Sequence, residues 1–495
     1  MASPTTNDPT IVIIGAGIAG ITAAITFKRA GFDRFVILEK GSDVGGVWHW
    51  NRYPGIACDV PSFVYQFSFA LKPDWSRIWS DGDEIQRYHR DVVDRFGLRE
   101  HLRLNAEVVA AEFCDPDWKI TLADGTSLTA DFVVAATGVL HHPFIPDIPG
   151  LSDFQGAVVH SARWDDSVET SRRKIAVIGS GSTAVQLVSA LQPEAAHLTQ
   201  FSRSPQWVMW APTDLLQSRL MTRILASAPL VNRKLHDAGL WATGLLADVV
   251  LRPTWRRRLV QRFARWSLRA QIHDKELRRK LTPDYQPLCK RQVLSGTYYQ
   301  AIAAPNAKLV TDSITHITES GVATADGAHH NVDTIVLATG FHPHNYMRPM
   351  NLRGRAGVTI DEAWVNGPRA YRMTAIPGFP NLFTVLGPNS PTGSISLQYS
   401  AELTAQYITH WLRKFRDGQL LTVEVTEEAT ERFNDAVVSA MGPTVWNTGC
   451  NSWYFTDQKT IDLWPFDRKA MCRMLEKPDE RDFIVKHDAQ TTVYR

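Results

Sequence analysis

The stretch TIVIIGAGIAG, residues 10–20, decides the fold of the chain. Its first five residues form a short β-branched run that enters the glycine-rich turn GAGIAG. The following residues 21–31 (ITAAITFKRAG) predict a helix that ends at a glycine, and residues 35–39 (FVILE) predict a second strand. Strand, glycine-rich turn, helix and strand within about thirty residues is the context in which G-x-G-x-x-G predicts a dinucleotide-binding unit.

Each glycine of this turn has an expected function. Gly15 permits the tight turn, Gly17 lets the backbone approach a pyrophosphate, and Gly20 lets the helix pack closely on the strand. The N-terminus of the helix then faces the phosphates. Glu39, at the end of the second predicted strand, is placed to accept hydrogen bonds from ribose hydroxyls. A glycine-rich turn without a ligand is the alternative.

The same pattern recurs later in the chain. Residues 174–178 (KIAVI) enter GSGSTA, residues 179–184, in which alanine replaces the third glycine. A predicted helix and a second strand, within residues 197–204 (HLTQFSRS), follow. We expect this second turn to bind a nucleotide through Gly179, Ser180, Gly181, Ser182 and Thr183.

The residue at the end of the second strand differs between the two units. Glu39 follows Gly15 by 24 positions, and Arg203 follows Gly179 by the same 24 positions. A carboxylate suits a free ribose 2′-hydroxyl, whereas a guanidinium forms a forked pair of hydrogen bonds with a 2′-phosphate. The first unit is therefore predicted to bind FAD or NAD, and the second to bind NADP through Arg203 and its neighbour Ser204. In the alternative, Arg203 is a solvated charge at a strand end.

Two such units predict a flavoprotein that takes hydride from NADPH. The segments DFVVAATG (131–138) and DTIVLATG (333–340) each end an apolar strand in a small-residue turn close to a nucleotide. The predicted fold class is α/β, with two Rossmann-like dinucleotide-binding domains, for FAD and NADP, and a helical insertion in the NADP domain. The expected FAD domain covers residues 1–150 and 343–495 with a C-terminal loop, the NADP domain 151–214 and 284–342, and the insertion 215–283.

Bulk properties exclude several classes of protein. The chain has 495 residues, too many for one core, and its apolar content of 44% is that of an ordinary globular protein. A net charge of +2 gives no reason to expect nucleic acid as a partner. Without a signal-peptide pattern or an uncharged apolar run of 18 residues, the chain is expected to be cytoplasmic. Five scattered cysteines predict free thiols and argue against a dithiol redox centre, and no metal site is predicted.

A family resemblance enters with FQGAVVHSARWD, residues 154–165, which lacks helical or strand periodicity. It matches F-x-G-x-x-x-H-x-x-x-W-[P/D] at Phe154, Gly156, His160, Trp164 and Asp165. With GGVWHWNRYPGIACD, residues 45–59, this motif makes the chain resemble the Baeyer–Villiger monooxygenases. In that family the motif lies between the flavin and NADP domains. The resemblance therefore implies a hinge or linker role for these five residues, ahead of proton transfer by His160.

The resemblance also implies a reaction. NADPH reduces FAD, reduced flavin and dioxygen give a peroxyflavin, and this attacks a small ketone to yield an ester or lactone. The alternative within enzymes is an N- or S-oxygenating flavin monooxygenase, so a sulfide is a second substrate class. An uncoupled NADPH oxidase and a catalytically inactive binding protein are weaker alternatives. Neither the particular ketone nor the oligomeric state is predicted.

The same resemblance assigns catalytic residues in the run CKRQVLSGTYY, residues 289–299. Arg291 is expected to stabilise the anionic peroxide, and Lys290 to bind the NADP 2′-phosphate. Asp59 is expected to pair with Arg291, with a plain structural ion pair as the alternative. Flavin contacts are carried over to Gly46, Val47, Trp48, Trp50, Tyr65 and, less securely, Val108, for which core packing is the alternative.

Two further segments carry expectations. Residues 215–280 mix Leu, Trp and Phe with clustered arginines, which is compatible with a helix on an anionic membrane surface. Because Asp248, Asp274 and Glu276 dilute the basic face, the sequence favours a solvated helical subdomain without a membrane partner. In the C-terminal part, Trp446 and Trp453 are candidates for lining or closing the site, with core packing as the alternative.

Overall fold

The computed structural model describes residues 8–487, and its first feature is a parallel sheet built around the first glycine-rich turn. The strand order is β19-β7-β1-β2-β3, and all neighbours are parallel. Every residue of the central strand is buried, because helices and loops cover both faces of the sheet. The strands are β1 (Ile11–Ile14), β2 (Phe35–Leu38), β3 (Leu102–Arg103), β7 (Phe132–Ala135) and β19 (Leu382–Thr384).

A second parallel sheet repeats this arrangement around the second turn. Its order is β13-β10-β9-β17-β8. In both sheets the strand before the glycine-rich turn is central, with the Glu39 or Arg203 strand on one side and the Ala-Thr-Gly strand on the other. The strands are β8 (Ala157–His160), β9 (Lys174–Ile178), β10 (His197–Phe201), β13 (Ala307–Val310) and β17 (Thr334–Leu337).

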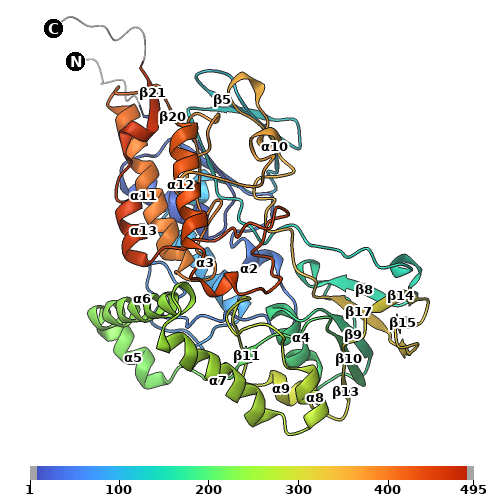
Figure 1. Ribbon diagram of the computed structural model, residues 1–495. Coiled ribbons are helices and arrows are strands. Elements are labelled where there is room, and N and C mark those ends of the chain that lie inside the picture. The colour runs from blue at the N-terminus through green and yellow to red at the C-terminus, as the bar shows by residue number, and fades with distance from the viewer. Residues whose placement is uncertain (1–7, 488–495) are drawn as a thin grey trace, which may run out of the picture.

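Helices follow both turns and cover the sheets. In the first unit α1 (Ile18–Arg29) packs against α11 (Leu397–Arg416), and in the second unit α4 (Ser182–Leu191) packs against α9 (Tyr298–Ile302). Figure 1 shows the first unit above, with α11 and α12 (Glu427–Ala440) upright, and the second sheet below and to the right. Chain from both ends of the sequence thus builds the first unit, since β19 and α11 lie far from β1 in sequence.

Smaller elements complete the two units. A four-stranded sheet has the order β18-β4-β5-β6, a three-stranded sheet has the order β14-β15-β16, and two short pairs join β11 to β12 and β20 to β21. These elements and the remaining helices are β4 (Val108–Phe113), β5 (Trp118–Leu122), β6 (Ser127–Ala130), β11 (Val208–Met209), β12 (Val293–Leu294), β14 (Ile314–Thr318), β15 (Gly321–Thr324), β16 (His329–Asn331), β18 (Asn351–Arg353), β20 (Thr422–Val425), β21 (Phe483–Lys486), α2 (Val47–Trp50), α3 (Gly82–Arg95), α10 (Ile360–Ala363) and α13 (Arg468–Leu475).

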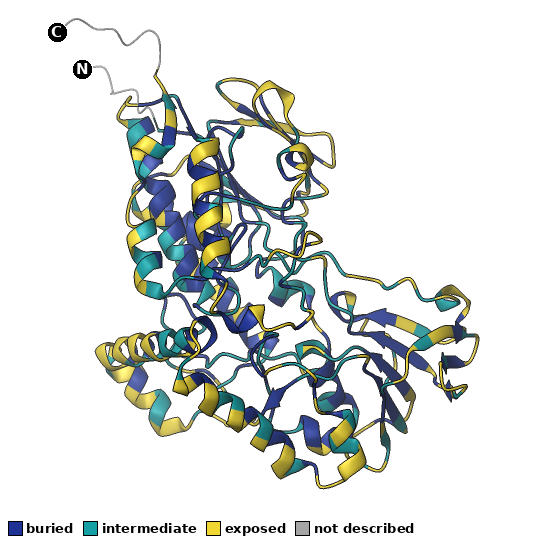
Figure 2. Cartoon of the chain, in the orientation of Figure 1, coloured by how far each residue is buried: buried dark blue, intermediate teal, exposed yellow. Residues whose placement is uncertain are grey.

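The segment between β11 and β12 is helical. It forms α5 (Arg219–Ser227), α6 (Pro229–Leu251), α7 (Trp255–Gln271) and α8 (Lys275–Lys280). Figure 2 shows that the outward surfaces of α5, α6 and α7 are largely exposed, whereas most residues of the two parallel sheets are buried. Among residues 8–487, no helix is both long and apolar enough to cross a bilayer. The domain boundaries expected from the sequence stay a prediction.

A tight contact joins the two units. Gly55 has φ +80°, and a Cβ there would lie 2.7 Å from the Ala190 Cβ on α4. Nearby, the Tyr53 hydroxyl donates to Gln186 Oε1 at 2.7 Å, and Gln186 Nε2 donates to the Ala57 carbonyl at 2.8 Å. The segment between Tyr53 and Ala57 can approach α4 this closely because position 55 has no side chain.

The segment FQGAVVHSARWD differs from its sequence-based description. Residues Ala157–His160 form β8, the edge strand of the second sheet, paired in parallel with β17. The sequence shows no alternation of apolar and polar residues here, because Val158 is apolar although it lies in an edge strand and is 42% exposed. The segment therefore belongs to the second sheet as well as linking the two units.

Candidate active site

The first glycine-rich turn forms a bare backbone surface. Gly15 has φ +105°, and a Cβ there would lie 2.6 Å from the Ala136 carbonyl oxygen. A Cβ on Gly20 would lie 1.9 Å from the Gly15 carbonyl oxygen, so α1 packs directly on the strand. Gly46 approaches Gly17 so closely that a Cβ on Gly46 would lie 2.9 Å from the Gly17 Cα. Backbone rather than side chains therefore lines this turn, as a bound pyrophosphate requires.

Glu39 lies at the carboxyl end of β2, beside this turn. It is 5% exposed, and its two carboxylate oxygens accept hydrogen bonds from the Ala16 and Gly41 amides, both at 2.7 Å. These bonds hold the carboxylate in one orientation and leave lone pairs for ribose hydroxyls. Val108, the first residue of β4, lies two positions after Ala106. The Ala106 amide donates to the Glu39 carbonyl oxygen at 2.9 Å, so β4 begins near Glu39.

The predicted flavin-contacting aromatics occupy two places. α2 begins directly after Gly46 with Val47. The Trp48 Nε1 donates to the Tyr65 hydroxyl at 3.0 Å, and burial raises the pKa of Tyr65 above its usual value. Trp50 instead lies toward the second unit, with the guanidinium of Arg163 4.7 Å from its ring centre. Contact of these residues with a flavin stays a prediction.

Arg291 and Asp59, far apart in sequence, meet in the structure. Arg291 Nη2 lies 2.9 Å from Asp59 Oδ1, and Arg291 Nη1 donates to the Thr392 carbonyl at 3.1 Å. The charge of Asp59 raises the pKa of Arg291 above its usual value, so the guanidinium is always protonated. The Arg291 side chain remains 36% exposed, against 16% for Asp59. Arginine has five N–H donors, so some remain for a ligand on this open side.

The stretch of chain that contacts Arg291 through Thr392 holds buried polar atoms without partners. Among the residues described, Asn389 Oδ1, Thr392 Oγ1, Ser394 Oγ and Gln398 Nε2 are buried and make no hydrogen bond. They lie in the stretch before α11 or in its first turn, and this stretch includes Thr392, whose carbonyl accepts from Arg291. Leaving such atoms unpaired costs roughly 1–3 kcal/mol each. The donor and acceptor edge of a flavin ring fits this set, and the helix N-terminus favours its electron-rich side.

The backbone of the second glycine-rich turn is also open to a ligand. A Cβ on Gly179 would lie 2.3 Å from the Ala338 carbonyl oxygen, whereas a Cβ on Gly181 would meet nothing within 4 Å. Gly181, which has this free space beside it, directly precedes α4, whose first residues are Ser182 and Thr183. Backbone is thus accessible to a phosphate at the N-terminus of α4.

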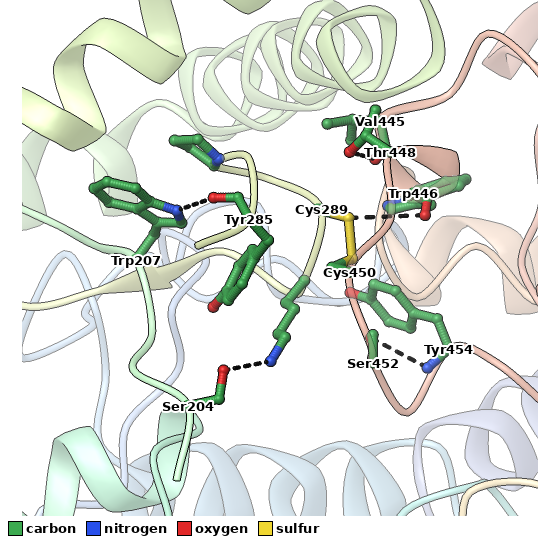
Figure 3. The surroundings of a disulfide bond; sticks show 12 residues. Ser204, Trp207, Tyr285, Cys289, Val445, Trp446, Thr448, Cys450, Ser452 and Tyr454 are labelled. Atoms are coloured by element: carbon green, nitrogen blue, oxygen red, sulfur yellow. Dashed lines mark hydrogen bonds between the residues drawn. A yellow bond between two sulfur atoms is a disulfide. The ribbon is translucent and has the colours of Figure 1, made fainter. Parts of the chain in front are cut away.

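Three residues expected at a 2′-phosphate come together beside this turn. The Lys290 Nζ donates to the Ser204 Oγ at 3.2 Å (Figure 3), and the Ser180 Oγ donates to the Ser204 carbonyl at 2.6 Å. Burial and, to a lesser degree, the charge of Arg203 lower the pKa of Lys290. Arg203 is exposed. Lys290 and Arg203 therefore repel each other. An anion bound between them, such as a phosphate, would offset this repulsion.

Four of the five residues of the FQGAVVHSARWD motif contact the second unit, and Asp165 makes a local turn with Ser167. The His160 Nδ1 accepts from the Ala162 amide at 3.0 Å, its Nε2 lies 3.4 Å from Thr339 Oγ1, and burial lowers the pKa of His160. Phe154 and Trp164 pack on the cores of the second unit, a Cβ on Gly156 would lie 2.3 Å from the Asp333 carbonyl, and Asp165 accepts from the Ser167 amide and hydroxyl. These contacts fit a positioning role, which stays a prediction.

One expectation was wrong, because Cys289 and Cys450 form a disulfide. They lie 161 positions apart and are both buried, while Cys58, Cys114 and Cys472 are free. Spacing could not reveal the pair, since no C-x-x-C motif is involved and the partners belong to different segments. Figure 3 shows the bond between the chain leading to Arg291 and the C-terminal segment that holds Trp446 and Tyr454. Trp446 is 1% exposed and thus packs in the core.

Comparisons with known proteins agree with this geometry. A family model described as pyridine nucleotide-disulphide oxidoreductase matches residues 12–226. The chain is 46% identical over 477 residues to an uncharacterized monooxygenase of Mycobacterium tuberculosis, covering 96% of each chain. It is 38% identical over 489 residues to a Baeyer–Villiger monooxygenase of Streptomyces coelicolor, covering 98% of this chain and 94% of that one.

Solved structures give the same result. Cyclohexanone monooxygenase from Rhodococcus sp. Phi1 bound to NADP+ superposes with a TM-score of 0.86 at 27% identity, covering 97% of this chain and 99% of that chain. Identity to a named Baeyer–Villiger monooxygenase thus extends along nearly the whole sequence, and the fold agrees over the same length. The chain belongs to the family of Baeyer–Villiger monooxygenases.

Proposed function

We propose that Arg291, held by Asp59, supplies the fixed positive charge for oxygen insertion next to a ketone carbonyl. The chain is an FAD-containing, NADPH-dependent Baeyer–Villiger monooxygenase that converts a ketone into an ester or lactone. When bound, FAD accepts hydride from NADPH and activates dioxygen. The observation that carries the proposal is the 2.9 Å contact between Arg291 and Asp59, together with the hydrogen bond from Arg291 to the Thr392 carbonyl.

The first unit provides the flavin site. The bare backbone of residues 15–20 would hold the pyrophosphate at the N-terminus of α1, and Glu39 would hold the ribose hydroxyls. The unpartnered atoms of Asn389, Thr392 and Gln398 would offer hydrogen bonds to the polar edge of the ring.

Arg291 acts by charge and position. Its pKa is raised by Asp59, so it stabilises the negative charge that develops on oxygen during the transfer at every pH in the working range. Asp59 and the Thr392 carbonyl each bind one side of the guanidinium and hold its free N–H groups in one direction. Because the site needs no rearrangement to meet this charge, the stabilisation is larger than a mobile cation would give.

The second unit selects the nucleotide. Lys290 donates to the Ser204 hydroxyl, the charge of Arg203 acts on Lys290, and both cations would bind the 2′-phosphate of NADPH. Replacing Arg203 by Ala should therefore raise KM for NADPH at least tenfold while KM for NADH stays nearly constant. An equal change in both KM values would contradict this assignment. His160 and Trp164 position the two units and take no part in proton transfer.

The experiment that tests the function uses the purified holoenzyme. Under air, NADPH consumption is followed with a panel of ketones and sulfides, and products are identified by mass. We expect an ester or lactone gaining one oxygen atom per NADPH consumed. Sulfoxide formation with every ketone inert would replace ketone oxidation by heteroatom oxygenation. Because NADPH is an intracellular reductant, we place the reaction in the cytoplasm.

A further inference from the structure

Helix α7 presents an apolar stripe to solvent. Trp255, Leu259, Phe263 and Trp266 are spaced by four, four and three positions, which places them on one side of a helix. Their exposed fractions range from 38% for Phe263 to 62% for Trp255. The rings of Phe263 and Trp266 stack with centres 5.6 Å apart. The stripe is thus a continuous, pre-ordered apolar surface.

The fold does not use this stripe for its own packing. The opposite side of α7 is buried through Ala264, Ser267 and Leu268, two of which belong to the core of the second unit. On the same buried side, the Arg257 guanidinium donates to the carbonyls of Val249, Val250 and Pro443. The helix therefore has two apolar sides, and the core accounts for only one.

Arginines run alongside the exposed stripe. Arg258, Arg262, Arg265 and Arg269, spaced by four, three and four positions, form a second row next to the apolar one, and each is at least partly exposed. An apolar row bordered by a basic row is the pattern of a helix that lies in the plane of a membrane interface.

Neighbouring helices extend both properties. Residues 215–271 hold 11 Arg and Lys but only two Asp and Glu, a net charge of +9 in a chain whose total is +2. The rest of the chain therefore carries −7. Twelve of the 21 exposed large apolar residues among those described lie in this segment. Besides the stripe they are Leu215, Leu216, Leu220, Ile224, Leu230, Val231, Trp241 and Leu246.

The acidic residues that led the sequence to favour a solvated subdomain lie outside the stripe. Asp248 belongs to α6, and Asp274 and Glu276 lie at the start of α8, beyond the end of α7. α5 contacts α6 and α6 contacts α7. Figures 1 and 2 show the three helices side by side at one end of the molecule, with much of their outer surface exposed.

We propose that the outer surface of α5, α6 and α7 docks on an anionic lipid bilayer, with the α7 stripe lying in the interface. Exposed Trp side chains suit the headgroup level, Leu and Phe suit the acyl boundary, and the arginine row suits anionic headgroups. A second copy of the chain is a poorer occupant, because two copies of a segment with a net charge of +9 repel each other. Since no helix among residues 8–487 spans a bilayer, the contact is peripheral.

The test is vesicle sedimentation of the holoenzyme. We expect binding to vesicles of 70% phosphatidylcholine and 30% phosphatidylglycerol at 50 mM NaCl, at least tenfold weaker binding at 500 mM, and little binding to phosphatidylcholine alone. The triple variant Leu259→Gln, Phe263→Gln, Trp266→Gln should lose at least tenfold in partition coefficient. Val365, Val438 and Ile484, exposed apolar residues elsewhere, give the matched triple glutamine control, which should bind like the wild type.

Other outcomes overturn the proposal. Equal binding by wild type and α7 variant, or none to anionic vesicles at 50 mM NaCl, excludes the surface as a lipid-docking site. If light scattering shows a dimer that the α7 variant dissociates while no vesicles bind, the surface is an interface between copies. Melting temperature and NADPH oxidation in solution should stay unchanged in both triple variants, because these side chains are exposed and none of them is assigned to the catalytic or nucleotide-binding residues.

Discussion

Replacing Arg291 by glutamine removes the fixed charge while keeping a side chain of similar length. Asp59, 16% exposed, then loses the cation 2.9 Å from its carboxylate. At about 4 Å between charge centres and an effective dielectric of about 20 the pair is worth roughly 4 kcal/mol, or about 2 kcal/mol after screening at the exposed third of Arg291. Loss of one preorganised donor to a developing oxyanion costs about 2.7–4 kcal/mol, or 10²–10³ in rate.

Two assays separate these effects. Flavin reduction by NADPH without oxygen should stay near the wild-type rate, since Arg291 does not hold the hydride donor in the proposed arrangement. Under air, ester formation should fall 10²–10³-fold, and the NADPH consumed should appear as hydrogen peroxide. Ester formation within tenfold of the wild type would refute the assignment of Arg291.

A double variant distinguishes catalysis from structural pairing. Asp59→Asn with Arg291→Gln removes both charges, so thermal stability should recover most of the roughly 2 kcal/mol lost by the single Arg291 variant. Ester formation should not recover. If it does, Arg291 only neutralises Asp59, and the ion pair is purely structural.

Three further predictions follow from separate features. Denatured protein prepared without reductant should show three reactive thiols and reduced protein five, because Cys289 and Cys450 are joined; five in both would contradict the disulfide. Gly55→Ala should lower unfolding stability by at least about 1–2 kcal/mol, since φ is +80° and the added methyl meets Ala190; an unchanged melting temperature would contradict this contact. Burial raises the pKa of Asp462, so the folded state binds its proton more tightly than the unfolded state and stability falls as pH rises above about 4. The melting temperature of Asp462→Asn should therefore rise relative to the wild type between pH 4 and pH 7, and a constant difference would contradict the shift.

Local sequence was enough for both nucleotide-binding turns. The residues that matter lie within about thirty positions, so strand, turn and helix can be read together, and Glu39 and Arg203 occupy corresponding strand ends in the two sheets. Pairing of Asp59 with Arg291 came only through family resemblance, because 232 positions separate them. Nothing local links these two side chains.

Features that depend on contacts between distant parts of the chain were not predicted from the sequence. β19 joins the first sheet from residue 382, and Cys450 meets Cys289 only because the C-terminal segment folds back on the second unit. The end of α7 could not be located from composition either. The helix ends at Gln271, so Asp274 and Glu276 lie outside it, and the expectation of a solvated subdomain stays a prediction.

The covalent link between residues 289 and 450 has a practical consequence for anyone preparing this enzyme. Cys289 directly precedes Lys290 and Arg291, the cations proposed for the nucleotide and for the reacting oxygen, and Cys450 lies in the C-terminal segment with Trp446 and Tyr454. Dithiothreitol or a similar thiol in a purification buffer converts one molecular species into another with an untethered segment. Rates measured on the two preparations belong to different proteins and should be tabulated separately.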